Sequence, residues 1–281
     1  MANRRSGQPV TGVGRNALQV DQISRRISRS GRSNELSQTP KIIAHRGWSA
    51  LAPENTLAAF RAAIEVGADG IELDVQLSKD GHVVVIHDEK LDRTTNGSGP
   101  VADHTLAELS ELDAGGWFAP KYAGEPLPTL AAVFDLVRDT AWNGIINVEL
   151  KTSGVPYPGI EKAVVDLIRS YGLSEQVLIS SFNHYSLAET TRIAPEIKTA
   201  ILYTTQLYKP WEYAKGFGCA ALHPRRQPGM ERLVAGAKEA GLAVNVWTIN
   251  STQHADELAE AGVTGLITDV PDELLRHFGR G

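Results

Sequence analysis

The stretch from Ile42 to Asp88 reads IIAHRGWSALAPENTLAAFRAAIEVGADGIELDVQLSKDGHVVVIHD, and it sets the pattern that the rest of the chain repeats. A short apolar run at 42–46 is followed by a helical pattern at 56–66 and by a second apolar run at 70–77. Two apolar runs joined by a helix are typical of a parallel βαβ unit. The stretch therefore predicts parallel strands connected through helices.

The same alternation continues to the end of the chain. Strands are expected at 42–46, 70–77, 144–151, 177–182, 198–203, 219–223, 242–248 and 265–269. Helices are expected at 56–66, 129–139, 158–171, 184–193, 210–216, 229–240, 252–261 and 271–278. Eight strands and eight helices in strict alternation predict an α/β fold, a closed (β/α)8 TIM barrel.

Two segments lie outside this alternation and form a small insertion after the second strand. The run 82–87 follows that strand too closely for a parallel crossover, so it must fold back as a β-hairpin with Asp80-Gly81 in its turn. The segment 88–128 is rich in Gly, Pro, Asp and Thr and has only a weak helical pattern at 105–112. An insertion at the carboxyl end of a barrel strand lies over the active-site mouth, where it can act as a lid or specificity loop.

The composition is that of an ordinary globular protein. The 281 residues are 42% hydrophobic and 22% charged, and the formal net charge of −5 gives no indication of nucleic-acid binding. The single cysteine, Cys219, excludes an internal disulfide framework and a cysteine-based metal cluster. No run reaches the roughly 18 consecutive apolar residues of a membrane span, and the amino terminus lacks the apolar core of a signal peptide. These features predict a cytoplasmic enzyme and leave its oligomeric state open, a homo-oligomer included.

Residues 1–40 differ in composition from 41–281, which we expect to be the catalytic domain. They contain seven arginines against Asp21 and Glu35, and few large apolar side chains. Such a segment cannot offset its ordering entropy by burial, so we expect a flexible basic extension. Two alternatives stay open, namely a short amphipathic helix that begins at Val20 and a weak contact of this arm with an anionic surface or a neighbouring subunit.

Ionisable side chains gather at the carboxyl ends of the first strands, where barrels of this type carry their catalytic groups. The strand at 70–77 carries Glu72 and Asp74, which are two residues apart and so share one face, and the strand at 144–151 carries Glu149. Three carboxylates without cysteine favour Mg²⁺ or Ca²⁺ over zinc or copper. The alternative is a salt-bridge network with the basic residues of the same strands, but three facing acids would repel one another without a cation.

Two histidines end the first strand and the hairpin. His45 and His87 suit acid and base catalysis at neutral pH, and Arg46 suits a phosphate group. A site that holds these groups together with a cation would act on a phosphate ester. His223 ends the sixth strand, where contact with the leaving-group side of a substrate competes with a structural role. Asp269 is expected to cap the last helix.

Two further residues, Glu54 and Trp247, have a functional interpretation beside a structural one. Asn55 or Thr56 can cap the first helix, which leaves the preceding Glu54 for a role near the metal or the substrate hydroxyls. Trp247 lies on the seventh strand, where it either forms a wall of the substrate site or packs in the barrel core.

The combination of these motifs is more specific than any one of them. It consists of His45-Arg46-Gly47, Pro53-Glu54-Asn55-Thr56, Glu72-x-Asp74, His87-Asp88 and Glu149-x-Lys151, followed by Ser180-Ser181-Phe182, Val246-Trp247-Thr248 and Gly265-Leu266-Ile267-Thr268-Asp269. Over about 41–278 the chain resembles the glycerophosphodiester phosphodiesterase family. The resemblance implies a (β/α)8 barrel with an inserted segment after the second strand region.

The resemblance also implies a reaction, the hydrolysis of a glycerophosphodiester to sn-glycerol 3-phosphate and an alcohol with a divalent cation, Mg²⁺ or Ca²⁺. The family's functional residues match positions of this chain: metal ligands at Glu72, Asp74 and Glu149, an acid–base pair at His45 and His87, and phosphate-binding groups at Arg46 and Lys151. The sequence does not decide which histidine is the acid, or whether water or the substrate's own 2-hydroxyl attacks phosphorus. Two alternatives remain, a phospholipase D-like activity on lysophospholipids and a non-catalytic barrel that binds phosphoesters.

Overall fold

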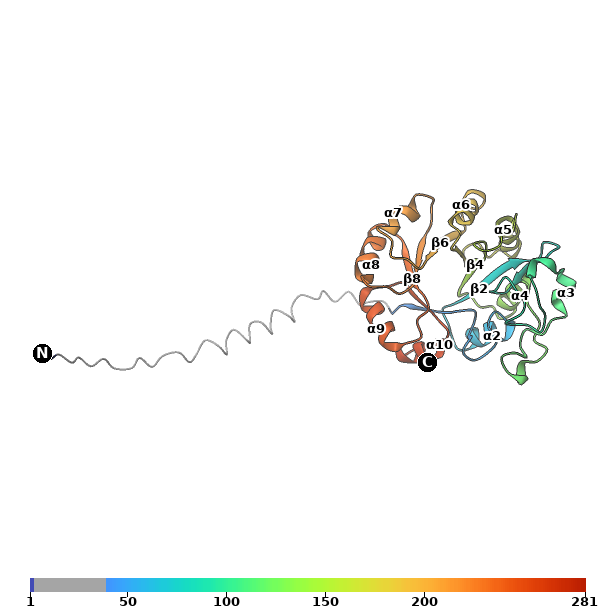
Figure 1. Cartoon of the computed structure of the whole chain (residues 1–281), viewed down its shortest axis with the longest axis horizontal. Coiled ribbons are helices and arrows are strands. Elements are labelled where there is room, and N and C mark those ends of the chain that lie inside the picture. Colours follow the sequence, from blue (N-terminus) through green and yellow to red (C-terminus); the bar gives the residue numbers. More distant parts are fainter. Residues whose placement is uncertain (3–38) are drawn as a thin grey trace. The chain divides into compact units, whose positions relative to one another are not determined.

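Eight parallel strands form a closed barrel in the part of the chain that the computed structural model describes, residues 1–2 and 39–281 (Figure 1). They are β1 (Lys41–Ala44), β2 (Gly70–Leu77), β4 (Ile145–Leu150), β5 (Val177–Ser181), β6 (Lys198–Tyr203), β7 (Ala221–Pro224), β8 (Ala243–Val246) and β9 (Gly265–Thr268). Because β1 pairs with both β2 and β9, these eight strands close into a ring and the predicted (β/α)8 barrel is confirmed. The predictions for residues 3–38 lie outside the described residues.

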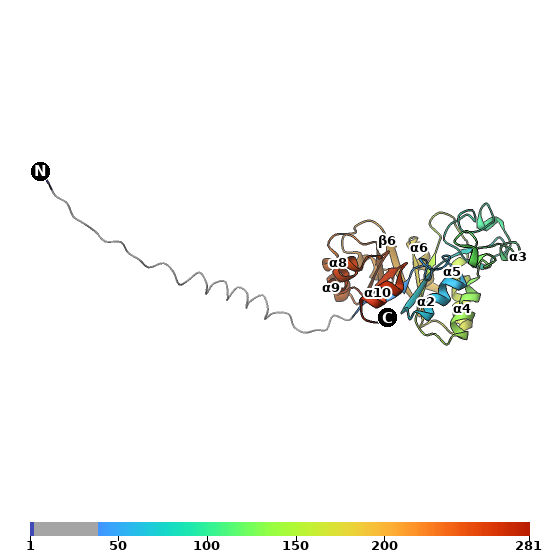
Figure 2. The same ribbon diagram turned by 90° about the horizontal axis from the view of Figure 1, so that it is seen from below.

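The helices lie around the outside of this barrel (Figures 1 and 2). They are α2 (Leu57–Glu65), α4 (Leu130–Asp139), α5 (Ile160–Tyr171), α6 (His184–Ile193), α7 (Pro210–Lys215), α8 (Met230–Glu239), α9 (Thr252–Ala261) and α10 (Pro271–His277). The spacing of α5 shows why they pack there, since its buried residues Ile160, Val164, Val165 and Ile168 recur with the helical period and form one stripe. Among the described residues, no helix is long and apolar enough to span a membrane.

The predicted hairpin is confirmed and brings His87 back to the barrel rim. The strand β3 (Val83–Val85) runs antiparallel to the end of β2, with Val75 opposite Val85. The backbone N–H of Ile86 then donates to the carbonyl of Asp74 at 3.0 Å. The strand β2 therefore continues beyond its pairing with β4 at Gln76 and Leu77, and the chain returns beside the acid pair.

The inserted segment after the hairpin shares a small apolar core with the hairpin. It contains the 3₁₀ turns η1 (Val101–Asp103) and η2 (Pro120–Tyr122) and the short helix α3 (Leu106–Ser110), which corresponds to the weak pattern at 105–112. Its core consists of Val84, Ile86, Leu91, Val101, Leu109, Ala114 and Leu127. Both views show α3 on the side of the barrel away from α8 and α9 (Figures 1 and 2).

The alternation of side chains along β2 positions the acids. All eight residues of this strand are buried, and Ile71, Leu73 and Val75 belong to the large apolar core that also contains Phe60 of α2. Since neighbouring side chains on a strand point to opposite faces, the residues between these apolar positions point into the barrel. These residues are Glu72 and Asp74.

Candidate active site

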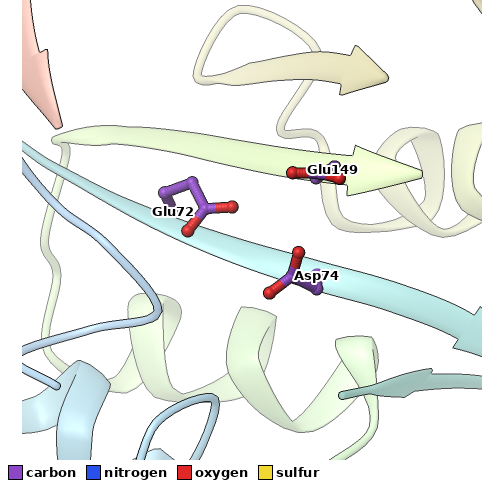
Figure 3. A group of neighbouring side chains, drawn as sticks. All are labelled: Glu72, Asp74 and Glu149. Atoms are coloured by element: carbon purple, nitrogen blue, oxygen red, sulfur yellow. The ribbon is translucent and has the colours of Figure 1, made fainter. Parts of the chain in front are cut away.

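Three carboxylates meet inside the carboxyl end of the barrel (Figure 3). Asp74 on β2 is the register partner of Glu149 on β4, and Glu72 lies two residues earlier on the same face. One oxygen from each of the three lies within 4.8 Å of the others, and all three side chains are largely buried. This is the arrangement that the sequence predicted, and an oxygen-only set of this kind suits a hard divalent cation.

The electrostatics of the cluster support the same ligand. Burial, followed by repulsion from Asp74, raises the pKa of Glu72 to about 8 and that of Glu149 to about 7. Burial also acts on Asp74, but nearby Arg46 and Lys151 outweigh it and lower the pKa of Asp74. Three ionised carboxylates would carry more negative charge than the two basic side chains can compensate. A divalent cation would supply the missing positive charge, and it fits the oxygen donors of this set.

Both basic side chains of the predicted phosphate site touch these acids. Lys151 Nζ donates to Glu149 Oε1 at 2.9 Å and lies 3.8 Å from Asp74 Oδ1. Arg46 Nε lies 3.4 Å from Asp74 Oδ2, and the Arg46 backbone N–H donates to Glu72 Oε2 at 2.9 Å. The metal-ligand set and the salt-bridge network, which the sequence left as alternatives, thus occupy the same place.

A strained turn after β1 holds Arg46 in position. Arg46 and Asn55 both have left-handed backbone angles, with φ of 56° and 58°, and the Asn55 N–H donates to the Arg46 carbonyl at 3.0 Å. Between them Gly47 has φ of 79° and lies so close to α2 that an added Cβ would be 2.6 Å from the Ala59 carbonyl carbon.

Of the two residues predicted to cap α2, Thr56 does so, because its side-chain oxygen accepts a hydrogen bond from Ala59 N. The other candidate, Asn55, donates from its side chain to Asp74 Oδ2 at 2.9 Å instead.

His45 is held by a carboxylate from the far end of the chain. Its Nδ1 lies 2.6 Å from Asp269 Oδ1, and its Nε2 lies 4.0 Å from Glu72 Oε2. Burial lowers the pKa of His45, but these two acids outweigh it and the net direction is upward. The prediction that Asp269 caps the last helix is wrong, because Val270 occupies the N-cap of α10 and makes no side-chain capping hydrogen bond. Asp269 also accepts from Ser49 and Asn250.

His87 has a similar partner in its own neighbour. His87 Nδ1 lies 2.6 Å from Asp88 Oδ1, and Asp88 in turn accepts two hydrogen bonds from Arg93, at 2.7 and 2.9 Å. The Arg93 guanidinium holds the pKa of Asp88 far below its usual range. The pKa of His87 is lowered, because burial together with nearby Arg46 outweighs the acids.

Glu54 joins Arg46 of the site to Arg93 of the inserted segment. Its Oε1 accepts from Arg46 Nη1 at 2.7 Å and from Arg93 Nη2 at 2.8 Å. The pKa of Glu54 is lowered, because Arg93 and Arg46 outweigh the effect of burial. The structure thus places Glu54 beside the site, where it holds the Arg46 guanidinium.

The pocket has a charged side and an apolar side. The side chains that line it are His45, Arg46, Glu72, His87, Asn147, Glu149, Lys151, Phe182, Leu202, Trp247 and Ile267. The charged members come from β1, β2, β4 and the hairpin, and the apolar ones follow or belong to β5, β6, β8 and β9. Phe182 and Trp247 pack edge to face, with ring centroids 5.6 Å apart. Trp247 therefore lies where a wall of the substrate site was predicted.

His223 lies deeper than the pocket surface. Its side chain is fully buried, its Nε2 accepts from Asn245 Nδ2 at 2.9 Å, and its backbone carbonyl accepts from Trp247 Nε1 at 2.8 Å. Burial lowers the pKa of the imidazole to about 3. The contact with a leaving group stays a prediction, because His223 is not among the residues that line the pocket.

The sequence reasoning missed two residues that hold the histidines and one that links the site to the insertion. Asp88 could have been found, because it follows His87 directly. Asp269 gave a misleading signal, since an aspartate shortly before a proline resembles a helix cap. Arg93 lies in an irregular segment where no periodicity indicates the direction of its side chain.

The fold and this pocket define a class of protein, the (β/α)8-barrel hydrolases that act on phosphate esters. The glycerophosphoryl diester phosphodiesterase family model matches residues 45–273, and the chain belongs to that family. A glycerophosphodiester phosphodiesterase from Caldanaerobacter subterraneus subsp. tengcongensis is 48% identical over 240 residues, which cover 85% of this chain and 98% of the relative. One from Bacillus altitudinis is 41% identical over 238 residues, 84% of this chain and 97% of that protein.

Solved structures agree with this assignment. An Oleispira antarctica phosphodiesterase in complex with the product sn-glycerol-3-phosphate superimposes with a TM-score of 0.79 at 33% identity, over 86% of this chain and 98% of that one. A glycerophosphodiester phosphodiesterase from Agrobacterium tumefaciens gives a TM-score of 0.73 at 34% identity, over 84% and 99% of the two chains. The resemblance inferred from the motifs is confirmed, and the protein is an enzyme of this family.

Proposed function

We propose that the protein hydrolyses glycerophosphodiesters to sn-glycerol 3-phosphate and an alcohol, with a divalent cation held by Glu72, Asp74 and Glu149. One observation carries the proposal, namely that two basic side chains and two carboxylate-bound histidines line one pocket together with Glu72 and Glu149, and that an oxygen of the third acid, Asp74, lies within 4.8 Å of an oxygen of each. The product complex of the Oleispira antarctica relative supports the identity of the phosphate-containing product. The choice between Mg²⁺ and Ca²⁺ is left to experiment.

The charged side of the pocket binds the phosphate. Arg46 and Lys151 are fixed by the carboxylates they touch, so their remaining N–H groups can donate charge-assisted hydrogen bonds to non-bridging oxygens. A bound divalent cation supplies further stabilisation of the negative charge that develops on the phosphate oxygens. The apolar side, with Trp247 and Phe182, is left for the carbon skeleton of the glycerol.

The histidines move the protons. In each one Nδ1–H donates to a carboxylate, so the neutral ring keeps its lone pair on Nε2, which is free to face the substrate. One Nε2 accepts the proton of the attacking hydroxyl while a new P–O bond forms. The other histidine starts protonated on Nε2 as well, and it gives that proton to the alkoxide as its P–O bond breaks. His45 and His87 carry these two roles, and the geometry does not favour either order.

The test is an assay of several substrates against several metal conditions. Glycerophosphocholine, glycerophosphoethanolamine and glycerophosphoglycerol are incubated with EDTA, Mg²⁺ or Ca²⁺, and sn-glycerol 3-phosphate is measured directly. We expect release with at least one cation and none in EDTA. Lysophosphatidylcholine is assayed in parallel, and faster turnover of this lipid would favour the phospholipase D-like alternative. If none of these diesters is hydrolysed under any condition, the proposed reaction is wrong.

A further inference from the structure

We propose that Arg93, in the inserted segment, is a positioning residue that fixes His87 and Arg46 at the same time. The inference rests on the proposed function, because it takes these two residues as groups that move a proton and bind phosphate. It goes beyond that function, since it gives the insertion a role in the chemistry as well as over the mouth.

Four hydrogen bonds join Arg93 to two carboxylates. Its Nε and Nη2 donate to Asp88 Oδ2 and Oδ1 at 2.7 and 2.9 Å. Its Nη1 and Nη2 donate to Glu54 Oε2 and Oε1, both at 2.8 Å. Each carboxylate is thus bound through both oxygens, which fixes its plane as well as its position.

The two oxygens that share Arg93 Nη2 are the ones that hold the functional side chains. Asp88 Oδ1 is also the partner of His87 Nδ1 at 2.6 Å. Glu54 Oε1 is also the acceptor of Arg46 Nη1 at 2.7 Å. Arg93 Nη2 therefore links His87, the proposed proton-transfer group, to Arg46, the proposed phosphate-binding group. A single carboxylate oxygen lies between it and each of them.

The backbone around Arg93 is well anchored. Leu91 is fully buried in the small apolar core of the insertion, and its carbonyl accepts from both the backbone N–H and the hydroxyl of Thr95, at 3.1 and 2.8 Å. Arg93 thus lies in a turn whose ends, Leu91 and Thr95, are hydrogen-bonded to each other, so its guanidinium points in a fixed direction. A group held this way can orient others without first being ordered itself.

The geometry requires an arginine. A guanidinium has five donors in one plane, which matches two bidentate carboxylates, whereas a lysine ammonium is a point charge with three donors. A lysine would keep the positive charge between Glu54 and Asp88 but could not fix both planes. The Arg93 side chain is 44% exposed, and ion pairs this open contribute little to folding stability. Its contacts are therefore better explained by orientation than by stabilisation of the fold.

The experiment compares Arg93→Ala and Arg93→Lys with Arg280→Ala. Arg280 makes a similar two-pronged contact with Asp69, at 2.7 Å through both nitrogens, far from the pocket. With glycerophosphocholine we expect kcat/KM of Arg93→Ala to fall on the order of 10- to 100-fold, the usual cost of losing a group that orients a functional side chain. Most of the loss should remain in Arg93→Lys, while Arg280→Ala should match the wild type. Added guanidinium ion should restore part of the activity of Arg93→Ala alone.

A second readout does not depend on turnover. The Nδ1–H proton of His87, assigned by NMR, should be sharp in the wild-type protein and broadened by exchange in Arg93→Ala, while that of His45 should be unchanged. An inactive wild-type enzyme would contradict the proposed function, and the His87 resonance would still decide the role of Arg93. Wild-type activity in Arg93→Lys, or an unchanged His87 resonance in Arg93→Ala, would overturn the positioning role.

Discussion

The two histidines of the site use the same hydrogen bond but take their support from different parts of the molecule. In both, Nδ1 lies 2.6 Å from an aspartate oxygen. The aspartate of His45 is 224 residues away and follows β9, so it is brought in by closure of the barrel. The aspartate of His87 is the next residue, and it depends on Arg93 of the insertion. One half of the mouth is thus built by the fold itself and the other by an addition to it.

The two histidines also differ in the direction in which their pKa values are shifted. Burial lowers the pKa of both, but Asp269 and Glu72 reverse this for His45, while nearby Arg46 adds to it for His87. Barrels of this type accept insertions at the carboxyl ends of their strands without changing the barrel. The comparison therefore suggests which changes should disable the whole site, which should act on one half, and which should act on neither.

The largest effect is expected from the three acids that both halves share. Glu72→Ala, Asp74→Ala and Glu149→Ala should each abolish hydrolysis of glycerophosphocholine, because each removes an oxygen ligand of the proposed cation site. EDTA should have the same effect on the wild-type enzyme. Circular dichroism should show an intact barrel, and Glu175→Ala, an exposed acid away from the pocket, is the control. Substantial turnover in any of the three variants would remove that residue from the ligand set.

The next effect tests the two histidines themselves. His45→Ala and His87→Ala should each lower kcat on the order of 10²–10⁴, the usual range for a positioned proton-transfer group. Both are expected to bind sn-glycerol 3-phosphate with little change, since Arg46 and Lys151 remain. Binding is measured by calorimetry alongside the rate. A variant that keeps turnover within a few-fold of the wild type would show that its histidine is structural.

A smaller and unequal effect is expected from the supporting aspartates. Asp269→Asn and Asp88→Asn keep the size of each side chain and weaken its hold on the ring, at a cost on the order of 10- to 100-fold in kcat. We expect the larger loss in Asp269→Asn, because His45 is the more buried ring and solvent can replace less of the lost interaction. Equal losses would show that the barrel and the insertion support their histidines equally well.

The sequence was sufficient for those parts of the site that follow from strand periodicity. Glu72 and Asp74 had to share a face because side chains alternate along a strand, and His87 had to return to the rim because four residues allow only a hairpin. These are local constraints, and each could be stated before any partner was known. The same holds for the ends of the barrel strands, which the structure moves by only a few residues.

The rest depended on contacts between distant or irregular segments. The Asp269–His45 contact exists only because β9 pairs with β1, and nothing near Asp269 in the sequence indicates that partner. Arg93 lies in a loop without periodicity, so its direction is set by the fold of the insertion. His223 was placed correctly near a strand end, but its complete burial beside Asn245 of the next strand depends on how β7 and β8 pack, which the local sequence does not reveal.

The smallest effect on activity is expected at His223, on the side of the barrel opposite the acids, and there the measurable change is in stability. Its pKa of about 3 in the folded state lies below the ordinary histidine value of about 6.5 that we take for the unfolded chain. Between these two values the unfolded state binds more protons, so the free energy of unfolding must fall as the pH is lowered. This contribution is fully present above pH of about 6.5 and decreases progressively below it.

His223→Gln should remove this dependence while leaving the charged side of the pocket unchanged. Urea unfolding of both proteins at several pH values between 7 and 4.5 gives the comparison, and the wild type should lose up to about 1.4 kcal/mol per pH unit more than the variant. Turnover of glycerophosphocholine at pH 7 should stay within a few-fold, since the side chain bonds to Asn245 and lies below the pocket surface. Parallel stability curves would mean that His223 is protonated in the folded protein. A large loss of turnover with normal stability would instead show that His223 reaches the substrate.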